Sequence, residues 1–148
     1  MLKLNRKGFT LVEVLLVIVI IAILAGIVIV AINPARQIAQ ANNTQRSSDV
    51  QAVMNAVHEY TIDNRGQLPA GITTTATVMG NGASQVDICS LLVPTYVAEM
   101  PYDPTDATAK YTSCSDYATS YTIASDAAGR ITVAAPNAEL SETISITR

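Results

Sequence analysis

The chain has 148 residues, enough for one modest domain with an attached segment, and its apolar residues are unevenly distributed. Three of its nine basic residues, Lys3, Arg6 and Lys7, precede the longest apolar run, which leaves six against twelve acidic residues. Because nucleic-acid binding draws most of its affinity from basic residues, this acidic balance argues against a nucleic-acid partner.

The first predicted element is an apolar helix over residues 14–32, which contain no charged side chain. At about 1.5 Å per residue such a helix is roughly 28 Å long, which matches the hydrocarbon thickness of a bilayer. Since lipid cannot satisfy backbone groups, we expect a helix despite the many β-branched residues. The basic residues before the run, with none after it until Arg36, predict a cytoplasmic N-terminus and an outward-facing remainder.

Glu13 directly precedes this charge-free run, where a carboxylate costs free energy that Leu or Val would not. A secretory signal peptide is one alternative, but such signals have a shorter apolar core followed by a small-x-small cleavage site. A simple monomeric membrane anchor is another, and it leaves the glutamate unexplained. Something in the working form of the protein must therefore compensate for this charge.

The residues from Lys7 to Glu13, KGFTLVE, resemble the type III signal of the type IV pilin superfamily. In that family a dedicated peptidase cuts after the glycine on the cytoplasmic side and methylates the new N-terminal residue, which implies cleavage after Gly8 and methylation of Phe9. The resemblance extends through the apolar helix. It implies a prepilin peptidase/methyltransferase and an inner-membrane assembly platform as partners, and a homopolymer of identical subunits.

The same resemblance implies a role for Glu13 in filament assembly. Cleavage would free a cationic amine on Phe9, and a helix that joins an apolar bundle must bury both this amine and a carboxylate. At about 4 Å and an effective dielectric near 20, their attraction is on the order of 4 kcal/mol, which offsets desolvation when subunits stack with the right stagger. The alternative is pairing within one chain, because Phe9 and Glu13 are four residues apart on one helix face.

Gly26 and Pro34 are the candidates for a kink or an unwound segment. Proline removes a backbone donor and clashes with the carbonyl four residues earlier, so we expect the helix to kink or loosen over residues 29–34. Pilin helices have a segment that unwinds on assembly, and the resemblance places it at residues 26–34, although the proline of many pilins lies closer to the N-terminus. The alternative is a simple bend at Asn33-Pro34 at the membrane surface.

Beyond Pro34, apolar residues at three- and four-residue spacings predict an amphipathic helix. We expect it to end at Asn64 or Arg65, because Gly66 suits the position after a helix. Residues 39–48 are polar on most faces and suit contact with neighbouring subunits or solvent. The apolar face comprises Val50, Val53, Met54, Val57 and Thr61, and the other faces carry Asp49, Gln51, Asn55, Glu59 and Asp63.

The outer part of the chain carries weaker local signals. Residues 73–79 are Thr-rich and predict either an extended surface segment or a short strand. Residues 87–93 predict a short helix that ends before Pro94. The stretch YVAEMPYDP, residues 96–104, resembles a segment of the major pseudopilins of type II secretion systems and of related bacterial pilins.

An antiparallel sheet is predicted at the C-terminal end. Residues 117–125 and 130–135 alternate in polarity around the turn 126–129, which predicts a hairpin, and residues 142–148 supply a further strand. The sheet is expected to cover the amphipathic helix, in an α+β, pilin-like fold. The expected segments are a cleaved leader at 1–8, an apolar transmembrane and filament-core helix at 9–34, an amphipathic helix half at 35–66 and a small globular domain at 67–148.

Two cysteines, Cys89 and Cys114, lie in the part expected to face outward. Thiols are readily oxidised outside the cytoplasm, so a single disulfide is the preferred interpretation. The chain-entropy model assigns roughly 3 to 4 kcal/mol to closing a loop of this length. Metal binding or a reactive thiol would need further ligands or a catalytic partner that the sequence does not show.

Calcium is a separate question, because major pseudopilins bind it in a loop near the sheet. Asp103, Asp106 and Asp116 are the candidate oxygen donors. They form no recognisable ligand loop, and the C-terminal hairpin departs from the pseudopilin pattern. We therefore assign these acids to turns and solvation and expect no metal site.

The sequence predicts a structural protein rather than an enzyme. It shows no nucleophile with its base, no phosphate-cradling glycine loop and no defensible carboxylate pair, so we expect no cofactor, and His58 is interpreted as a solvated or packing residue. The expected function is a subunit that is made in the cytoplasmic membrane and polymerises through its N-terminal helix into an extracellular or periplasmic type IV pilus-like filament, for adhesion, motility or as a surface appendage. The alternatives are a type II secretion pseudopilin and a minor tip or DNA-uptake binding subunit.

Overall fold

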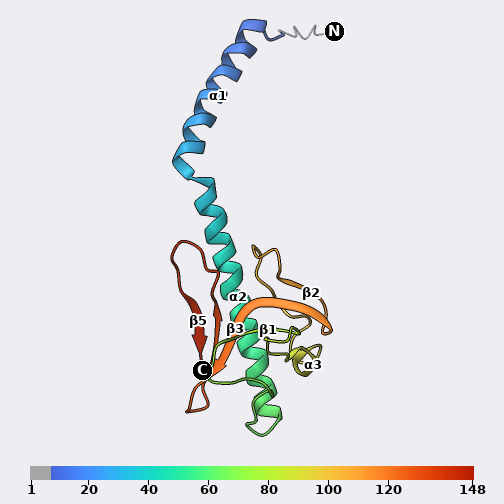
Figure 1. The fold of residues 1–148 in the computed structure, drawn as a ribbon. Helices are drawn as coiled ribbons and strands as arrows, with labels where there is room; N and C mark the ends of the chain where they lie inside the picture. Colours follow the sequence, from blue (N-terminus) through green and yellow to red (C-terminus); the bar gives the residue numbers. More distant parts are fainter. Residues whose placement is uncertain (1–7) are drawn as a thin grey trace, which may run out of the picture. The chain divides into compact units, whose positions relative to one another are not determined.

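The computed structural model describes residues 8–148, so the greater part of the predicted leader, residues 1–7, lies outside the described residues. The predicted α+β class is confirmed (Figure 1). Contacts divide the chain into two units, one ending at Gln37 and the other running from Ile38 to Arg148, and each is described by itself. The elements are α1 (Leu11–Ile32), α2 (Pro34–Asp63), β1 (Thr77–Gly80), α3 (Cys89–Leu92), β2 (Lys110–Ser113), β3 (Asp116–Ser125), β4 (Ile131–Ala135) and β5 (Ile144–Thr147).

The helical segment is interrupted once, at Asn33, which has left-handed backbone angles of φ 48° and ψ 78°. The Asn33 side chain accepts a hydrogen bond from the Arg36 N–H at 3.3 Å, so one residue ends α1 and caps the following helix. Pro34 is the first residue of α2, where its missing N–H costs nothing. Gly26 lies inside α1 and is helical.

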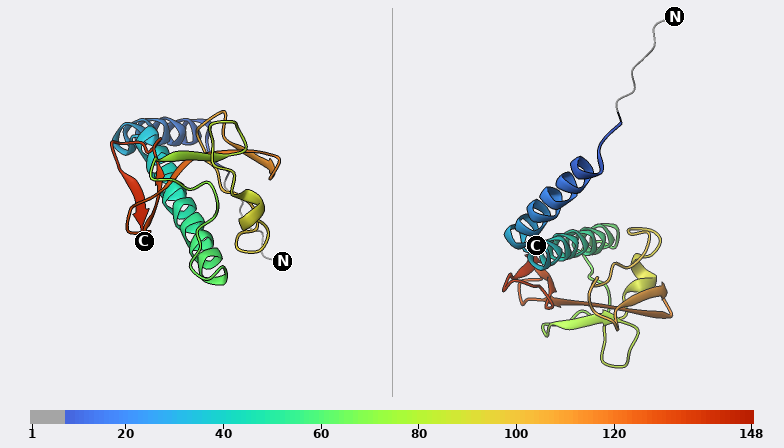
Figure 2. Two further views of the ribbon diagram at one scale, coloured as in Figure 1. Left: turned by 60° about the horizontal axis from the view of Figure 1, so that its bottom comes forward. Right: turned by 90° about the horizontal axis from the view of Figure 1, so that it is seen from above.

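The face of α2 that packs on the domain is the predicted apolar one. Val50, Val53, Met54 and Val57 are at most 1% exposed. The right-hand view of Figure 2 shows the strands as a layer along one side of this helix. The helix ends at Asp63, and positive φ angles in the next few residues terminate it close to the predicted point.

All strands of the sheet pair antiparallel, in the order β1-β3-β4-β5, and β2 pairs with the N-terminal part of β3. The predicted hairpin is confirmed: Ser125 on β3 faces Ile131 on β4. The further strand is present as β5. Of the Thr-rich segment, only its end from Thr77 is a strand. The four-residue strand β2 was not predicted, because it is too short to show a period.

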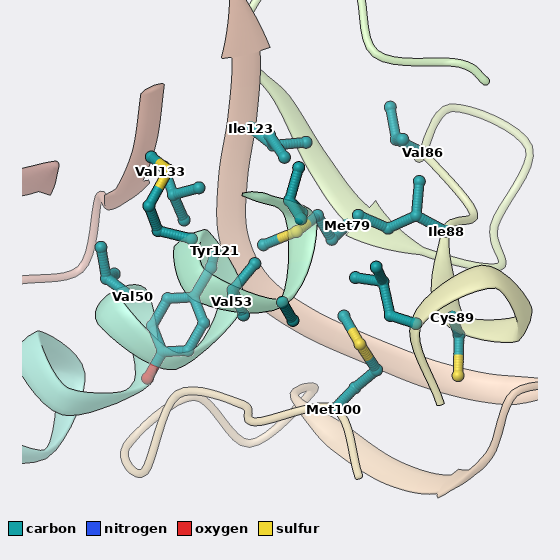
Figure 3. Close-up of a cluster of buried hydrophobic side chains, with 14 of the residues drawn as sticks. Val50, Val53, Met79, Val86, Ile88, Cys89, Met100, Tyr121, Ile123 and Val133 are labelled. Atoms are coloured by element: carbon teal, nitrogen blue, oxygen red, sulfur yellow. The ribbon is translucent and has the colours of Figure 1, made fainter. Parts of the chain in front are cut away.

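The hydrophobic core lies between α2 and the sheet (Figure 3). Tyr121 projects from β3 toward α2, beside Val50 and Val53. Met79, Ile88 and Met100 close the other end of the cluster from β1 and the loops. Burial of side chains of this size contributes about 1.5–3 kcal/mol each, so α2 and the sheet stabilise one another.

Residues 39–48 are mostly exposed, which suits the expected contact with neighbouring subunits or solvent, but three of them pack within the domain. Ala39, Asn43 and Arg46 are buried within the domain, and Arg46 is completely shielded. The amphipathic pattern did not reveal the burial of Asn43 and Arg46, because these side chains are polar and are held by hydrogen bonds rather than by apolar contact.

Candidate functional site

The N-terminal end of α1 is built around Thr10 and Glu13. Thr10 has extended backbone angles and is the N-cap, and its side-chain oxygen accepts from the Glu13 N–H at 3.3 Å. The Thr10 N–H and hydroxyl both donate to Oε2 of Glu13, each at 2.8 Å. This reciprocal capping box provides acceptors for backbone N–H groups that have no partner within the helix. The same hydrogen bonds stabilise the Glu13 carboxylate in the first turn.

The rest of α1 is an uninterrupted apolar surface. None of its 22 residues is buried in the described chain, and its most apolar stretch of 18 residues has a mean hydropathy of 3.6. The helix is long and apolar enough to cross a membrane. Phe9, just before it, is 88% exposed. Because apolar surface of this extent is unstable in water, α1 requires either lipid or other apolar helices around it.

Comparison with known families decides what this arrangement is. Residues 3–29 match the prokaryotic N-terminal methylation motif, and they include Gly8, Phe9 and Glu13. This is the prepilin-type signal of type IV pilins and pseudopilins. No curated protein and no solved structure matches the chain.

The prepilin-type signal accounts for the exposed residues Gly8 and Phe9 directly before the apolar helix α1. It implies processing by a prepilin peptidase and assembly in the membrane, and it fits a membrane-anchored precursor. Residues 3–7 of the match lie outside the described residues. Gly8 and Phe9, between which the resemblance implies cleavage, precede the helix and are exposed, so the bond between them is not protected by helical hydrogen bonds.

A second cluster of charge lies in the domain, around Arg46. Its guanidinium donates to both carboxylate oxygens of Asp103, from Nε at 2.7 Å and from Nη2 at 3.1 Å. It also donates to Glu139 at 2.9 Å and to Thr105 at 2.5 Å. Arg46 thereby ties α2 to the segment before β2 and to the loop between β4 and β5.

The electrostatics of this cluster follow from its contacts. The hydrogen bonds that Arg46 donates to Asp103 raise the pKa of Arg46, against the effect of burial, so the guanidinium is always charged. Burial alone would raise the pKa of Asp103, but the hydrogen bonds from Arg46 and Thr105 outweigh it and hold this pKa below its ordinary value. The hydrogen bond from Arg46 likewise lowers the pKa of Glu139.

Asp49, one turn farther along α2, is in a different environment. It is 6% exposed and accepts from the Tyr121 hydroxyl at 2.8 Å and from Gln45 Nε2 at 2.7 Å. Burial raises its pKa, and these two hydrogen bonds compensate only in part. Burial and the neighbouring carboxylate also raise the pKa of Tyr121, which keeps the hydroxyl protonated as a donor.

The three acids considered for calcium are occupied by separate partners. Asp103 is bound by Arg46, and Asp116 pairs with Lys110 at 2.6 Å. Asp106 accepts from Ser120 at 2.6 Å and from Thr108, and these bonds lower its pKa to about 2. Within residues 8–148, no group of three His, Cys, Asp or Glu side chains is arranged to hold a metal ion.

A disulfide joins Cys89, at the start of α3, to Cys114, just after β2. Their Cα atoms are 5.2 Å apart, and Cys89 is buried in the core. Beside it, the Tyr117 hydroxyl accepts from the backbone N–H groups of Ile88 and Cys89 and donates to Asp87 at 2.9 Å. The disulfide and this tyrosine together fix α3 against the sheet.

The sequence predicted the prepilin-type signal and the disulfide, but two buried charges on α2 were missed. Arg46 was counted with a polar segment, and Asp49 was assigned to a face away from the core. One signal could have found them: a charged residue that stands one turn before an apolar stripe is positioned to reach polar atoms at the rim of a sheet.

Proposed function

We propose that this protein is a structural subunit that is processed by a prepilin peptidase and polymerises through α1 into a type IV pilus-like filament. The observation that carries the proposal is that α1, which lies largely within the prepilin-type signal, has no buried residue and carries a single carboxylate at its start. Lipid can cover such a helix in the precursor. Outside the membrane, only the α1 helices of other subunits would supply comparable apolar surface.

Glu13 is suited to pair with a second subunit. Both Thr10 donors bond to its Oε2, and Oε1 accepts no hydrogen bond within residues 8–148. After cleavage at Gly8, the free amine of Phe9 in an adjacent subunit would supply a cation for this oxygen. An ion pair in an apolar bundle is costly if either member is left alone, so the pair would select one stagger between subunits.

Replacement of Glu13 by Leu tests the proposal. We expect Glu13→Leu to enter the membrane and to lose its leader, while filaments recovered from cells are lost. Val17→Leu is the matched control, because it changes an exposed apolar position of the same helix and should leave assembly intact. Normal filaments from the Glu13→Leu variant would reject the proposed role.

Intact-mass analysis of the native protein provides a second test. The proposal predicts a chain that begins at Phe9 and carries one methyl group on its amine, with both cysteines oxidised. An uncut, unmethylated chain as the working form would contradict processing and assembly together. Recovery in filaments sheared from the cell surface supports a pilus, whereas retention in the periplasm supports a secretion pseudopilus.

A further inference from the structure

A groove of about 580 Å³ lies between α2 and residues 97–104 of the domain. From α2 it is lined by Gln45, Asp49 and Ala52, and from the facing segment by Glu99 and Tyr102 with apolar neighbours. Tyr102 is 45% exposed, and Glu99 is exposed at the surface. The groove is therefore largely apolar, but it contains one buried and one exposed carboxylate.

The charge of Asp49 has no counterion within the described part of the chain. Its two carboxylate oxygens accept neutral hydrogen bonds from Tyr121 and Gln45, and none of the four ion pairs includes it. Arg46, the nearby buried cation, is committed to Asp103 and Glu139. A carboxylate in this position gains from a cation that enters the groove, because burial has already removed most of its water.

An arginine side chain is complementary to the residues that line this groove. Its methylene stem can pack on apolar surface, its planar guanidinium can stack on an aromatic ring such as Tyr102, and its charge can reach Asp49 and Glu99. A guanidinium is also less strongly hydrated than a lysine ammonium, so it loses less on entering a half-buried site.

Three exposed arginines of this chain show no acidic partner within residues 8–148: Arg36, Arg65 and Arg148. Arg36 lies in the unit that carries α1, the part of the chain through which the subunits are proposed to assemble. Arg65 and Arg148 lie in the same unit as the groove. Assembly through α1 therefore favours Arg36 as the arginine that a second subunit supplies.

We propose that the groove between α2 and residues 97–104 binds the Arg36 side chain of a second copy of this chain. The proposal rests on the proposed filament function and adds a specific contact between domains to the contact between α1 helices. It gives the uncompensated carboxylate of Asp49 a partner that exists only in the assembled state.

Photocrosslinking in filaments tests this contact directly. Full-length protein with p-benzoylphenylalanine in place of Tyr102 is assembled from a mixture of isotopically labelled and unlabelled subunits. The expected product joins the residue 102 peptide of one isotope form to the Arg36 peptide of the other. Crosslinks to the Arg65 peptide, or crosslinks only within one chain, would overturn the proposal.

Exchange of the two charges provides a second test of the contact between Arg36 and the groove. We expect Arg36→Glu to lower the yield of filaments several-fold, and Glu99→Lys in the same chain to restore it at least in part. Arg65→Glu is the matched control and should assemble like the unmodified protein. Unchanged assembly of Arg36→Glu, or no recovery in the doubly changed chain, would refute the contact.

The two proposals fail in distinguishable ways. If the unmodified chain is processed and forms filaments, but neither the crosslink nor the charge exchange behaves as expected, only the groove contact is wrong. If the unmodified chain forms no filament, the proposed function itself is wrong.

Discussion

Arg46 and Asp103 form an ion pair in which both side chains are completely shielded from solvent, with Nε and Oδ2 2.7 Å apart. They are far apart in sequence, on α2 and in the segment before β2. A buried pair of this kind contributes little net stability as a whole, but removal of one partner leaves an uncompensated charge. The pair therefore enforces one way of docking α2 on the domain.

Replacement of Arg46 by Met should destabilise the domain strongly. Loss of one member of a buried ion pair costs about 3–5 kcal/mol, because the other charge stays buried without compensation. Urea unfolding of the full-length protein in detergent, followed by circular dichroism, measures the change in free energy. Arg130→Met, which removes a surface pair with Asp126, is the control and should change it little. Equal effects of the two variants would show that Arg46 is not structurally special.

The same pair predicts how the free energy of unfolding changes with pH under acidic conditions. The pKa of Asp103 is lower in the folded than in the unfolded chain, so its stabilising contribution is complete above the unfolded value of about 3.9. That contribution is lost as the pH falls through the lower folded value. We expect the free energy of unfolding to fall on acidification below about pH 4, and to fall less in Arg46→Met. If the free energy of unfolding fell equally with pH in the unmodified protein and in Arg46→Met, the Arg46–Asp103 pair would not be the cause.

The pKa of Asp49 is shifted in the opposite direction from that of Asp103. Burial raises its folded pKa, so its stabilising contribution is complete below the unfolded pKa and is lost as the pH rises through the folded value. Asp49→Asn should therefore be as stable as the unmodified protein or more stable at pH 7, with a difference that vanishes in acid. Glu59→Gln, an exposed change on the same helix, is the control. Strong destabilisation by Asp49→Asn at pH 7 would show that the charge itself is needed in the isolated subunit.

Removal of the disulfide should lower stability without a change of fold. Its cysteines are 25 residues apart, and the chain-entropy model assigns about 3–4 kcal/mol to a loop of this size. The double variant Cys89→Ala, Cys114→Ala is compared with the oxidised protein by urea unfolding under identical conditions. A loss close to zero would indicate that the hydrogen bonds of Tyr117 alone hold α3 in place.

Shortening a side chain of α2 should lower the stability of the protein at a buried position but not at an exposed one. Met54 is 1% exposed, and its replacement by Ala is expected to cost about 2–5 kcal/mol through lost burial and the remaining cavity. Ile62, on the same helix, is 64% exposed, so Ile62→Ala is the control and should have little effect. Thermal unfolding of both variants at one protein concentration makes the comparison.

Local patterns were enough for much of the fold. The apolar run predicted α1, the three- and four-residue spacing predicted the buried face of α2, and alternation around the turn 126–129 predicted the β3–β4 hairpin. These signals are readable because each depends on residues that are near one another in the chain. The prepilin-type signal is local in the same sense, since its parts occur within a few residues.

A bend at Asn33-Pro34 was one of the two alternatives from the sequence, and the structure has the interruption of the helices at Asn33. The missed features depend on residues far apart in sequence. The position of Arg46 one turn before the apolar stripe is a local signal, but its partners Asp103 and Glu139 come from distant loops and could not be identified from that signal. Strand β2 is too short to have a pattern of its own and exists only by pairing with β3.

The amino-acid sequence by itself determined the processing signal, the apolar helix and the amphipathic face of α2, because hydropathy and spacing act over one or two turns. Only the tertiary structure decided which charges on α2 are buried and which of them are paired. The physical reason is that a buried charge is stable only where the fold supplies donors or acceptors from other segments. Arg46 has such partners within this chain, whereas Asp49 has hydrogen bonds but no counterion.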